Sequence, residues 1–267
     1  MSQPVLLQEK LAALKALLRA HAPLLIAYSG GVDSSYLLAI AHQVLGDRIL
    51  GVIADSPSLP RRALADALDL ARTIGAPVEV VQTGEMENPE YISNPLNRCY
   101  FCKADLFANM DKLAHSRGFG ALAYGENADD PPQTRPGSQA AREFAVLAPL
   151  RQVGLTKADI RELSRELALP TADAPSQPCL SSRIPFGTPV TAEALAMVEA
   201  GEAHLRGLGF RVLRVRHHVE EGGKFRARVQ VAPSEMGAIA ALQPRIEEGL
   251  LAAGYDRVEI DPAGYQG

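Results

Sequence analysis

The stretch from Ser29 to Ser34 reads Ser-Gly-Gly-Val-Asp-Ser and follows a short apolar run that ends at Tyr28. Gly30 and Gly31 let the backbone approach an anion closely, and the helical pattern that begins at Ser34 adds the positive end of a helix dipole. The hydroxyl groups of Ser29 and Ser34 can donate further hydrogen bonds. The loop lacks the lysine of a Walker loop and the spacing of a dinucleotide-binding loop. The expected ligand is pyrophosphate, and a turn that binds nothing is the less favoured alternative.

Asp33 is the acidic residue of this loop. A carboxylate at that point would repel a bare phosphate group, so its natural use is to hold a Mg²⁺ ion that bridges the phosphates of a nucleotide. The loop and Asp33 together therefore predict a magnesium–phosphate site where an apolar strand passes into a helix.

The three cysteines form a second candidate site. Cys99 and Cys102 are separated by two residues, which lets both thiolates point at one metal ion or at one edge of a cluster. A closed zinc site needs a fourth protein ligand, whereas a [4Fe-4S] cluster held by these two and the distant Cys179 leaves one iron open, so the cluster is favoured. A redox dithiol with Cys179 as resolving thiol, and small core side chains without a ligand, are the alternatives.

The chain has 267 residues, of which 47% are hydrophobic and 22% are charged, and a formal net charge of −4. This composition is typical of a soluble globular protein, and the mild acidic balance is evidence against a nucleic-acid-binding surface. The N-terminus lacks the pattern of a signal peptide, and no uncharged apolar run reaches the roughly 18 residues of a membrane span. Because the number of cysteines is odd, a disulfide framework is not expected either. These features predict a cytoplasmic protein with neither a nucleic acid nor a membrane as partner.

Apolar runs alternate with helical repeats along the N-terminal part of the chain. The expected strands cover residues 24–28, 49–54, 78–81 and 121–124, and the expected helices cover 6–18, 34–44, 60–73, 103–116 and 156–169. This alternation is typical of right-handed βαβ units, so the expected fold class is α/β with a parallel sheet covered on both faces. Residues 125–139 are rich in Asp, Pro and Gly and are expected to form a functional lid.

The pattern changes after residue 170. Residues 171–189 are rich in proline and are expected to form a linker that carries Cys179. The remaining expected elements are helices at 191–207 and 233–252 and strands at 212–218, 225–231 and 257–260. The expected organisation is a large domain at 1–170, the linker at 171–189 and a smaller α+β domain at 190–267. A module of this size buries little surface alone, which favours assembly into an oligomer.

The phosphate loop, together with Gly-Glu-Asn-Ala-Asp-Asp at residues 125–130, resembles the PP-loop ATP pyrophosphatase family over the part of the chain before residue 150. The resemblance implies a Rossmann-like fold of the adenine nucleotide alpha hydrolase type, in which ATP adenylates a substrate oxygen and pyrophosphate leaves. It places adenine and ribose near Ala27 and near the segment from Ile53 to Ser56. It also places residues 125–130 beside the phosphates, where Asp129 or its neighbour could complete the Mg²⁺ site of Asp33. A capping turn is the alternative for this segment.

Further motifs extend the similarity to nearly the whole chain and resemble the LarE family of ATP-dependent sulfur transferases. They are Asn-Arg-Cys-Tyr-Phe-Cys-Lys at 97–103, Arg-Pro-Gly at 135–137, Cys-Leu-Ser-Ser-Arg at 179–183 and Leu-Arg-Val-Arg-His-His at 213–218. The resemblance implies that the carboxylates of pyridinium-3,5-biscarboxylic acid mononucleotide are adenylated and converted to thiocarboxylates, for the nickel-pincer cofactor of lactate racemase. It also places an active-site glutamate at Glu202.

Arg214 and Arg216 alternate along one expected strand and so project to the same face. Two guanidinium groups on one face suit a phosphate group, and the family motif supports that use for the phosphate of the substrate. A solvated basic strand is the alternative. His217 and His218, which follow in the same motif, are expected to be structural.

The resemblance implies two possible sources of sulfur. Members with a single cysteine at the position of Cys179 give up its sulfur and are left with dehydroalanine. Members that also match Cys99 and Cys102 carry a [4Fe-4S] cluster, for which delivery of a cluster-bound sulfide is the proposed chemistry. The cluster route is favoured here because this chain has all three cysteines, and sacrifice of Cys179 is the alternative. The family also implies a homo-oligomer, a trimer or a hexamer.

Two rival functions are compatible with the phosphate loop alone. One is a PP-loop amidotransferase or tRNA-thiolating enzyme, including an enzyme like NAD synthetase, although the acidic balance of the chain disfavours tRNA. The other is a nucleotide-gated iron–sulfur carrier that hydrolyses nothing. Neither explains the motifs around Cys179 and around Arg214 and Arg216 as well as the sulfur transferase does.

Overall fold

The computed structural model describes residues 3–131 and 136–265, and it divides the chain into two compact units. The first unit consists of Met1–Glu85 and Asn97–Gln177, and the second consists of Met86–Leu96 and Pro178–Gly267. The chain therefore enters the second unit briefly at Met86–Leu96, returns to the first unit, and enters the second unit again after Gln177.

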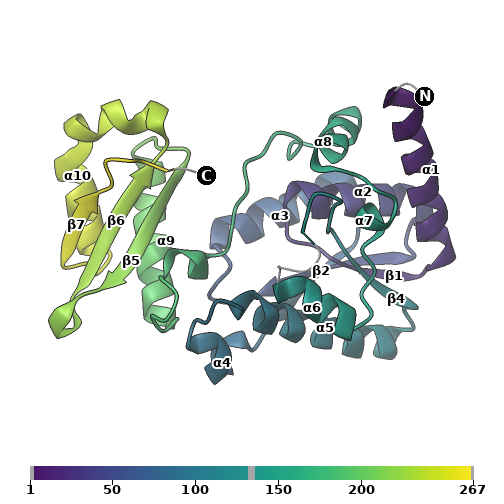
Figure 1. Ribbon diagram of the computed structural model, residues 1–267, viewed down its shortest axis with the longest axis horizontal. Helices are drawn as coiled ribbons and strands as arrows, with labels where there is room; N and C mark the ends of the chain where they lie inside the picture. Colours follow the sequence, from purple (N-terminus) through teal and green to yellow (C-terminus); the bar gives the residue numbers. More distant parts are fainter. Residues whose placement is uncertain (1–2, 132–135, 266–267) are drawn as a thin grey trace. The chain divides into compact units, whose positions relative to one another are not determined.

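The first unit is built on a parallel four-stranded sheet with the order β3-β2-β1-β4. Figure 1 labels β2, β1 and β4 of this sheet. Its strands are β1 (Leu24–Ala27), β2 (Ile49–Asp55), β3 (Val78–Gln82) and β4 (Ala121–Tyr124). Strands β2 and β3 lie on one side of β1, and β4 lies on the other. The order thus reverses at β1, and in open α/β sheets ligands bind outside the carboxyl ends of the strands at such a reversal. The loops that leave β1 and β4 are the ones at this point.

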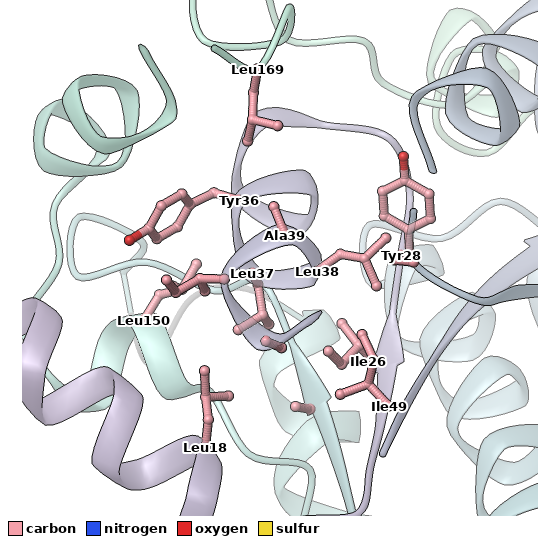
Figure 2. Packing of buried hydrophobic residues seen from close by; sticks show 14 of the residues in the cluster. Leu18, Ile26, Tyr28, Tyr36, Leu37, Leu38, Ala39, Ile49, Leu150 and Leu169 are labelled. Atoms are coloured by element: carbon pink, nitrogen blue, oxygen red, sulfur yellow. The ribbon is translucent and has the colours of Figure 1, made fainter. Parts of the chain in front are cut away.

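Helices cover both faces of the sheet. They are α1 (Gln3–Ala20), α2 (Val32–Leu45), α3 (Arg61–Ile74), α5 (Arg98–Arg117), α6 (Pro136–Glu143), α7 (Pro149–Gln152) and α8 (Lys157–Glu166). Neighbouring residues of β1 serve opposite faces: Ile26 belongs to a core that includes α1, α2 and α8, and Leu25 belongs to a core that includes α5 and α6. Figure 2 shows Leu37 and Leu38 of α2 packed near Ile26 in the first of these cores. Burial on both faces explains why the strands are continuous apolar runs.

The second unit has a three-stranded sheet with the order β5-β6-β7. Strands β5 (Leu213–Val219) and β6 (Phe225–Val231) pair antiparallel, and β7 (Arg257–Ile260) pairs parallel to β6. The helices are α9 (Ala192–Gly207), α10 (Ile239–Ala252) and the short α4 (Pro89–Ile92), with 3₁₀ turns at Glu85–Glu87, Leu180–Arg183, Glu221–Gly223 and Pro233–Ala238. One face of the sheet packs on α9 and α10, and its other face carries the arginines of β5 and β6.

The segment Met86–Leu96 is held in the second unit by its backbone and by Asn94. The Asn94 side chain is fully buried and donates hydrogen bonds to the carbonyl oxygens of Ile184 (3.3 Å), Pro185 (2.8 Å) and Thr188 (2.9 Å). The Tyr91 hydroxyl lies 2.7 Å from the Ser181 hydroxyl. These bonds join the segment to the turns that follow Cys179 in the sequence.

The predicted α/β class is confirmed, and the predicted strands and long helices are present with small shifts of their ends. Two local features of the structure are informative. Helix α5 begins at Arg98 and so includes Cys99 and Cys102, which were expected just before it. The last residues of the segment expected to form a lid belong to α6, which packs on α5, and Arg135 of the Arg-Pro-Gly motif lies outside the described residues. No helix within the described ranges is long and apolar enough to cross a membrane.

Candidate functional site

The phosphate loop connects β1 to α2 and closes on Ser34. The Ser34 hydroxyl accepts a hydrogen bond from the Ser29 backbone N–H (3.2 Å) and donates one to the Gly31 carbonyl oxygen (3.1 Å). Gly30 has φ +73°, and a Cβ there would lie 2.8 Å from the Cβ of Ala67, so the position requires glycine. Within the described chain the first turn of α2 has no side-chain cap, which leaves its N–H groups for an anion.

Asp33 lies in the first turn of α2 and is paired with a lysine that the sequence did not reveal. The Lys157 ammonium group donates to both carboxylate oxygens of Asp33, at 2.9 and 2.8 Å. The Asn127 side-chain amide also reaches Asp33, at 3.4 Å. The predicted magnesium ligand Asp33 therefore lies beside a positive charge and an amide donor. Both kinds of group can also donate hydrogen bonds to phosphate oxygens.

The loop that leaves β4 meets the phosphate loop directly. A Cβ on Gly125 would lie 2.8 Å from the Ser34 backbone nitrogen, so only glycine allows this approach. Asp129 accepts a hydrogen bond from the backbone N–H of Lys157 at 2.7 Å and thereby fixes the start of α8. Asn127 thus contacts Asp33 directly, and Asp129 is linked to Asp33 through Lys157.

Glu126 is a buried member of the same loop. Its carboxylate accepts hydrogen bonds from the Tyr124 hydroxyl at 2.6 Å and from the Ser138 hydroxyl, and Arg151 lies 3.4 Å away. Burial would raise the pKa of Glu126, but these hydrogen bonds and the positive charges of Arg151 and Lys103 outweigh it and hold the pKa below its usual value. The result is a charged anchor that ties the loop to α6.

The residues expected near adenine and ribose lie at the carboxyl ends of β1 and β2. Ala27 is the last residue of β1, whereas Ile53 is buried in the core and pairs with Val80 of β3. Just beyond β2, the hydroxyl groups of Ser56 and Ser58 both donate to the buried carboxylate of Glu85. The pairing of these hydroxyl groups with Glu85 was not predicted.

Cys99 and Cys102 lie three residues apart near the start of α5 and therefore share one face of the helix. Cys99 is exposed, and Cys102 is half-buried. Cys179 is half-buried and belongs to the second unit, just before a 3₁₀ turn. Among the described residues no group of three His, Cys, Asp or Glu side chains is placed to hold a metal ion. The pair on α5 fits one edge of a cluster, whereas the role of Cys179 as third ligand stays a prediction.

The second unit brings Cys179, Glu202, Arg214 and Arg216 together around Arg183, the last residue of the Cys-Leu-Ser-Ser-Arg motif. Arg183 donates to both carboxylate oxygens of Glu202, at 2.7 and 3.1 Å, and to the carbonyl oxygen of Cys179 at 2.9 Å. Arg216 donates to the carbonyl oxygen of Ser182, at 2.8 Å.

Positive charge is concentrated on this face of the β5–β6 sheet. Burial and the neighbouring Arg183 guanidinium lower the pKa of Arg214 and that of Arg216. Both groups remain charged near neutral pH, so their crowding creates a field that favours an anion. The Arg214 guanidinium also lies over the Tyr265 ring, 4.7 Å from its centroid. His217 faces the core between the rings of Phe225 and Tyr255, and burial lowers its pKa, which agrees with a structural role.

No family model matches the chain. An uncharacterised protein from Synechocystis sp. is 42% identical over 247 residues, which cover 91% of this chain and 89% of that protein. Pyridinium-3,5-bisthiocarboxylic acid mononucleotide synthase from Lactiplantibacillus plantarum is 30% identical over 261 residues, 97% of this chain and 93% of that enzyme. Glutamine-hydrolysing GMP synthase from Thermomicrobium roseum is 29% identical over 208 residues, 68% of this chain and 38% of that enzyme.

A parallel sheet whose order reverses at β1, with Ser-Gly-Gly-Val-Asp-Ser at the turn into α2, defines a PP-loop protein of the α/β class. The similarity to GMP synthase falls within this class. The similarity to the Lactiplantibacillus enzyme spans nearly the full length of both chains. The chain belongs to the LarE family, that of pyridinium-3,5-bisthiocarboxylic acid mononucleotide synthase.

Proposed function

We propose that this protein is an ATP-dependent sulfur transferase that converts the two carboxylates of pyridinium-3,5-biscarboxylic acid mononucleotide to thiocarboxylates. The product would serve the nickel-pincer cofactor of lactate racemase. Membership of the family whose Lactiplantibacillus member is named for the bisthiocarboxylic product supports the substrate. The observation that carries the proposal is the convergence of Asp33, Lys157 and Asn127 on the phosphate loop, because it supplies the charges that an adenylating enzyme needs.

In the first step a carboxylate oxygen of the substrate attacks the α-phosphorus of ATP, the bond to the β-phosphate oxygen breaks, and pyrophosphate leaves. Adenine and ribose would lie near Ala27 and Ile53, and the pyrophosphate part would lie on Ser29, Gly30, Gly31 and Ser34. Asp33 would hold a Mg²⁺ ion with Asp129 close by, and this ion would neutralise the charge that develops on pyrophosphate. Lys157, which reaches Asp33 from α8, would hold the β- and γ-phosphates.

In the second step a sulfur nucleophile attacks the acyl adenylate, the carbon–sulfur bond forms, and AMP leaves. We favour a sulfide bound to a [4Fe-4S] cluster on Cys99, Cys102 and Cys179, because the first two thiols share one helix face. The alternative is donation of the Cys179 sulfur itself.

Arg214 and Arg216 would bind the phosphate of the substrate, since the crowded positive charge of this face favours an anion. We expect the protein to act as a homo-trimer or hexamer.

The first test replaces Asp33. With ATP, Mg²⁺ and the substrate, the wild-type protein should release AMP and pyrophosphate, and the substrate should gain the mass difference between sulfur and oxygen at each carboxylate. Asp33→Ala should abolish AMP formation, because it removes the one carboxylate of the Ser29–Ser34 loop that would hold the metal. The matched control is Asp66→Ala, which removes an exposed carboxylate of α3. AMP formation that persists in Asp33→Ala, measured by chromatography, would count against the assignment.

A PP-loop amidotransferase is the second candidate, favoured by the similarity to GMP synthase. That similarity covers 38% of the synthase and 68% of this chain. The same assay separates the two functions, because an amidotransferase supplied with ammonia returns an amide of the substrate and a sulfur transferase returns a thiocarboxylate.

A further inference from the structure

Arg183 forms hydrogen bonds with the turn that carries Cys179. Its side chain is 2% exposed, and each of its guanidinium nitrogens donates a hydrogen bond. One edge of the guanidinium binds Glu202 of α9, and Nη1 donates to the carbonyl oxygens of Pro178 (2.6 Å) and Cys179 (2.9 Å) and to the Ser182 hydroxyl (2.9 Å). A planar guanidinium fixed on one edge holds its other edge rigidly. The buried Arg183 side chain thus fixes the orientation of the two peptide groups that flank the α-carbon of Cys179.

Glu202 is saturated with donors. Its Oε1 accepts from Arg183 and from the backbone N–H of Val215 (3.3 Å), and its Oε2 accepts from Arg183 and from Arg206 (2.9 Å). These four donors match the lone-pair sites of a carboxylate. The side chain is 1% exposed. Burial would raise the pKa of Glu202, but the two arginines outweigh it and hold the pKa below its usual value. A general base needs a lone pair within reach of the substrate proton, and Glu202 has both oxygens committed.

The same turn is also tied to β5. Arg216 donates to the Ser182 carbonyl oxygen, and the Val215 backbone N–H donates to Glu202. Strand β5 and the turn that carries Cys179 therefore belong to one hydrogen-bond network. Replacing a buried ion pair with well-packed apolar residues is often neutral or stabilising. Stability alone therefore does not explain this pair, whereas a need to fix the turn does.

We propose that Glu202 and Arg183 are positioning residues that set the direction of the Cys179 thiol relative to the arginines of β5, and that neither transfers a proton. The inference rests on the proposed function only in treating Cys179 as a functional thiol. It holds for both sulfur sources, because a cluster ligand and a sulfur donor each need a fixed direction.

The test measures the reactivity of Cys179 and needs no substrate. The full chain, freed of metal with a chelator, is treated with iodoacetamide, and the alkylation rate of each cysteine is followed by peptide mass spectrometry. Exposed Cys99 is the reference within the same chain. In Arg183→Lys one ammonium cannot bind Glu202 and both carbonyls at once, so the Cys179/Cys99 rate ratio should rise about tenfold, the factor that corresponds to one charge-assisted hydrogen bond.

Two further variants keep the test decisive. Ser182→Ala removes hydroxyl contacts to the Cys179 carbonyl and to Arg183 without disturbing a buried charge, so it should raise the ratio even if Arg183→Lys folds poorly. Arg206→Ala is the matched control, because Arg206 binds Glu202 without touching the turn. An unchanged ratio in folded Arg183→Lys and in Ser182→Ala, or an equal rise in Arg206→Ala, would overturn the proposal.

The pH profile of sulfur transfer separates positioning from proton transfer. Glu202→Gln should lower kcat and keep the acidic limb of the profile, whereas loss of that limb would make Glu202 a proton acceptor and overturn the inference. If no variant and no wild-type protein transfers sulfur, the proposed function fails while the alkylation result still decides the positioning role.

Discussion

Lys157 contacts both oxygens of Asp33, and the two side chains are 38% and 21% exposed. A pair this open to solvent contributes little to folding, about 1 kcal/mol or less. Its charge matters more for a ligand, because phosphates that arrive beside Asp33 would meet a cation already held in place.

We expect Lys157→Ala to raise the KM for ATP about tenfold, the effect of losing one charge-assisted contact to phosphate, with almost no change in unfolding free energy. Lys112→Ala, an exposed position on α5, is the control. Initial-rate kinetics and urea unfolding measure the two quantities. A large loss of stability with an unchanged KM would show that Lys157 serves the fold and not the nucleotide.

The Glu202 ion pairs make stability depend on pH. The pKa of Glu202 is lowered in the folded protein from its usual 4.5. The folded state therefore gains stability from Glu202 above that value, and the gain is lost as pH falls through the lower, folded pKa. The difference in unfolding free energy between wild type and Glu202→Gln should be larger near neutral pH than at about pH 3. A difference that is independent of pH, measured by urea unfolding, would mean that charge is not what the pair contributes.

At the scale of elements, helix α8 places Lys157 because its start is fixed. Thr156 and Asp159 form a capping box: the Thr156 hydroxyl accepts from the Asp159 N–H at 3.2 Å, and the Asp159 carboxylate accepts from the Thr156 N–H at 3.0 Å. Lys10 of α1 adds an ion pair to Asp159 at 2.7 Å. Lys157 is the first helical residue after this cap, so the cap determines where its side chain begins.

Thr156→Ala should cost about 1 kcal/mol of stability, as loss of an N-cap does, and should also raise the KM for ATP. Thr191→Ala is the matched control, because Thr191 caps α9 in the second unit by the same kind of bond. It should lower stability by a similar amount and leave the KM for ATP unchanged. Denaturant unfolding and ATP kinetics on both variants check this, and equal effects on KM would refute the link between the cap and Lys157.

The strands of the first unit could be predicted because burial on both faces makes each of them a short apolar run, as in Leu24–Ala27. The start of α5 could not, because its first residues include Cys and aromatic side chains, which are weak helix formers, and within the described chain Asn97 makes no side-chain cap. The partner of Asp33 was equally hidden: Lys157 lies 124 positions away in the sequence, and only tertiary packing brings the two together. Arg183 was recognised as part of a motif. Its hydrogen bonds to the turn at Cys179 could not be predicted, because Glu202 of α9 holds the other edge of its guanidinium group.

At the scale of the whole molecule, the two units differ in the chemistry that they present. The first carries the phosphate loop with Asp33 and Lys157, and the second carries Cys179 with Arg183 and the arginines of β5. Under the proposed function, nucleotide activation belongs to the first unit and substrate recognition to the second, and each unit has its own core.

The segment Met86–Leu96 also restricts how this gene can be cut, fused or rearranged. A fragment that begins at Pro178 contains most of the second unit but lacks Asn94, and the carbonyl oxygens of Ile184, Pro185 and Thr188 would lose its side-chain amide donor. A fragment that ends at Gln177 would carry that segment without the turns it binds. No single break point in the reading frame separates the two units, so recombination that exchanges one of them for a relative's must exchange two stretches of DNA together.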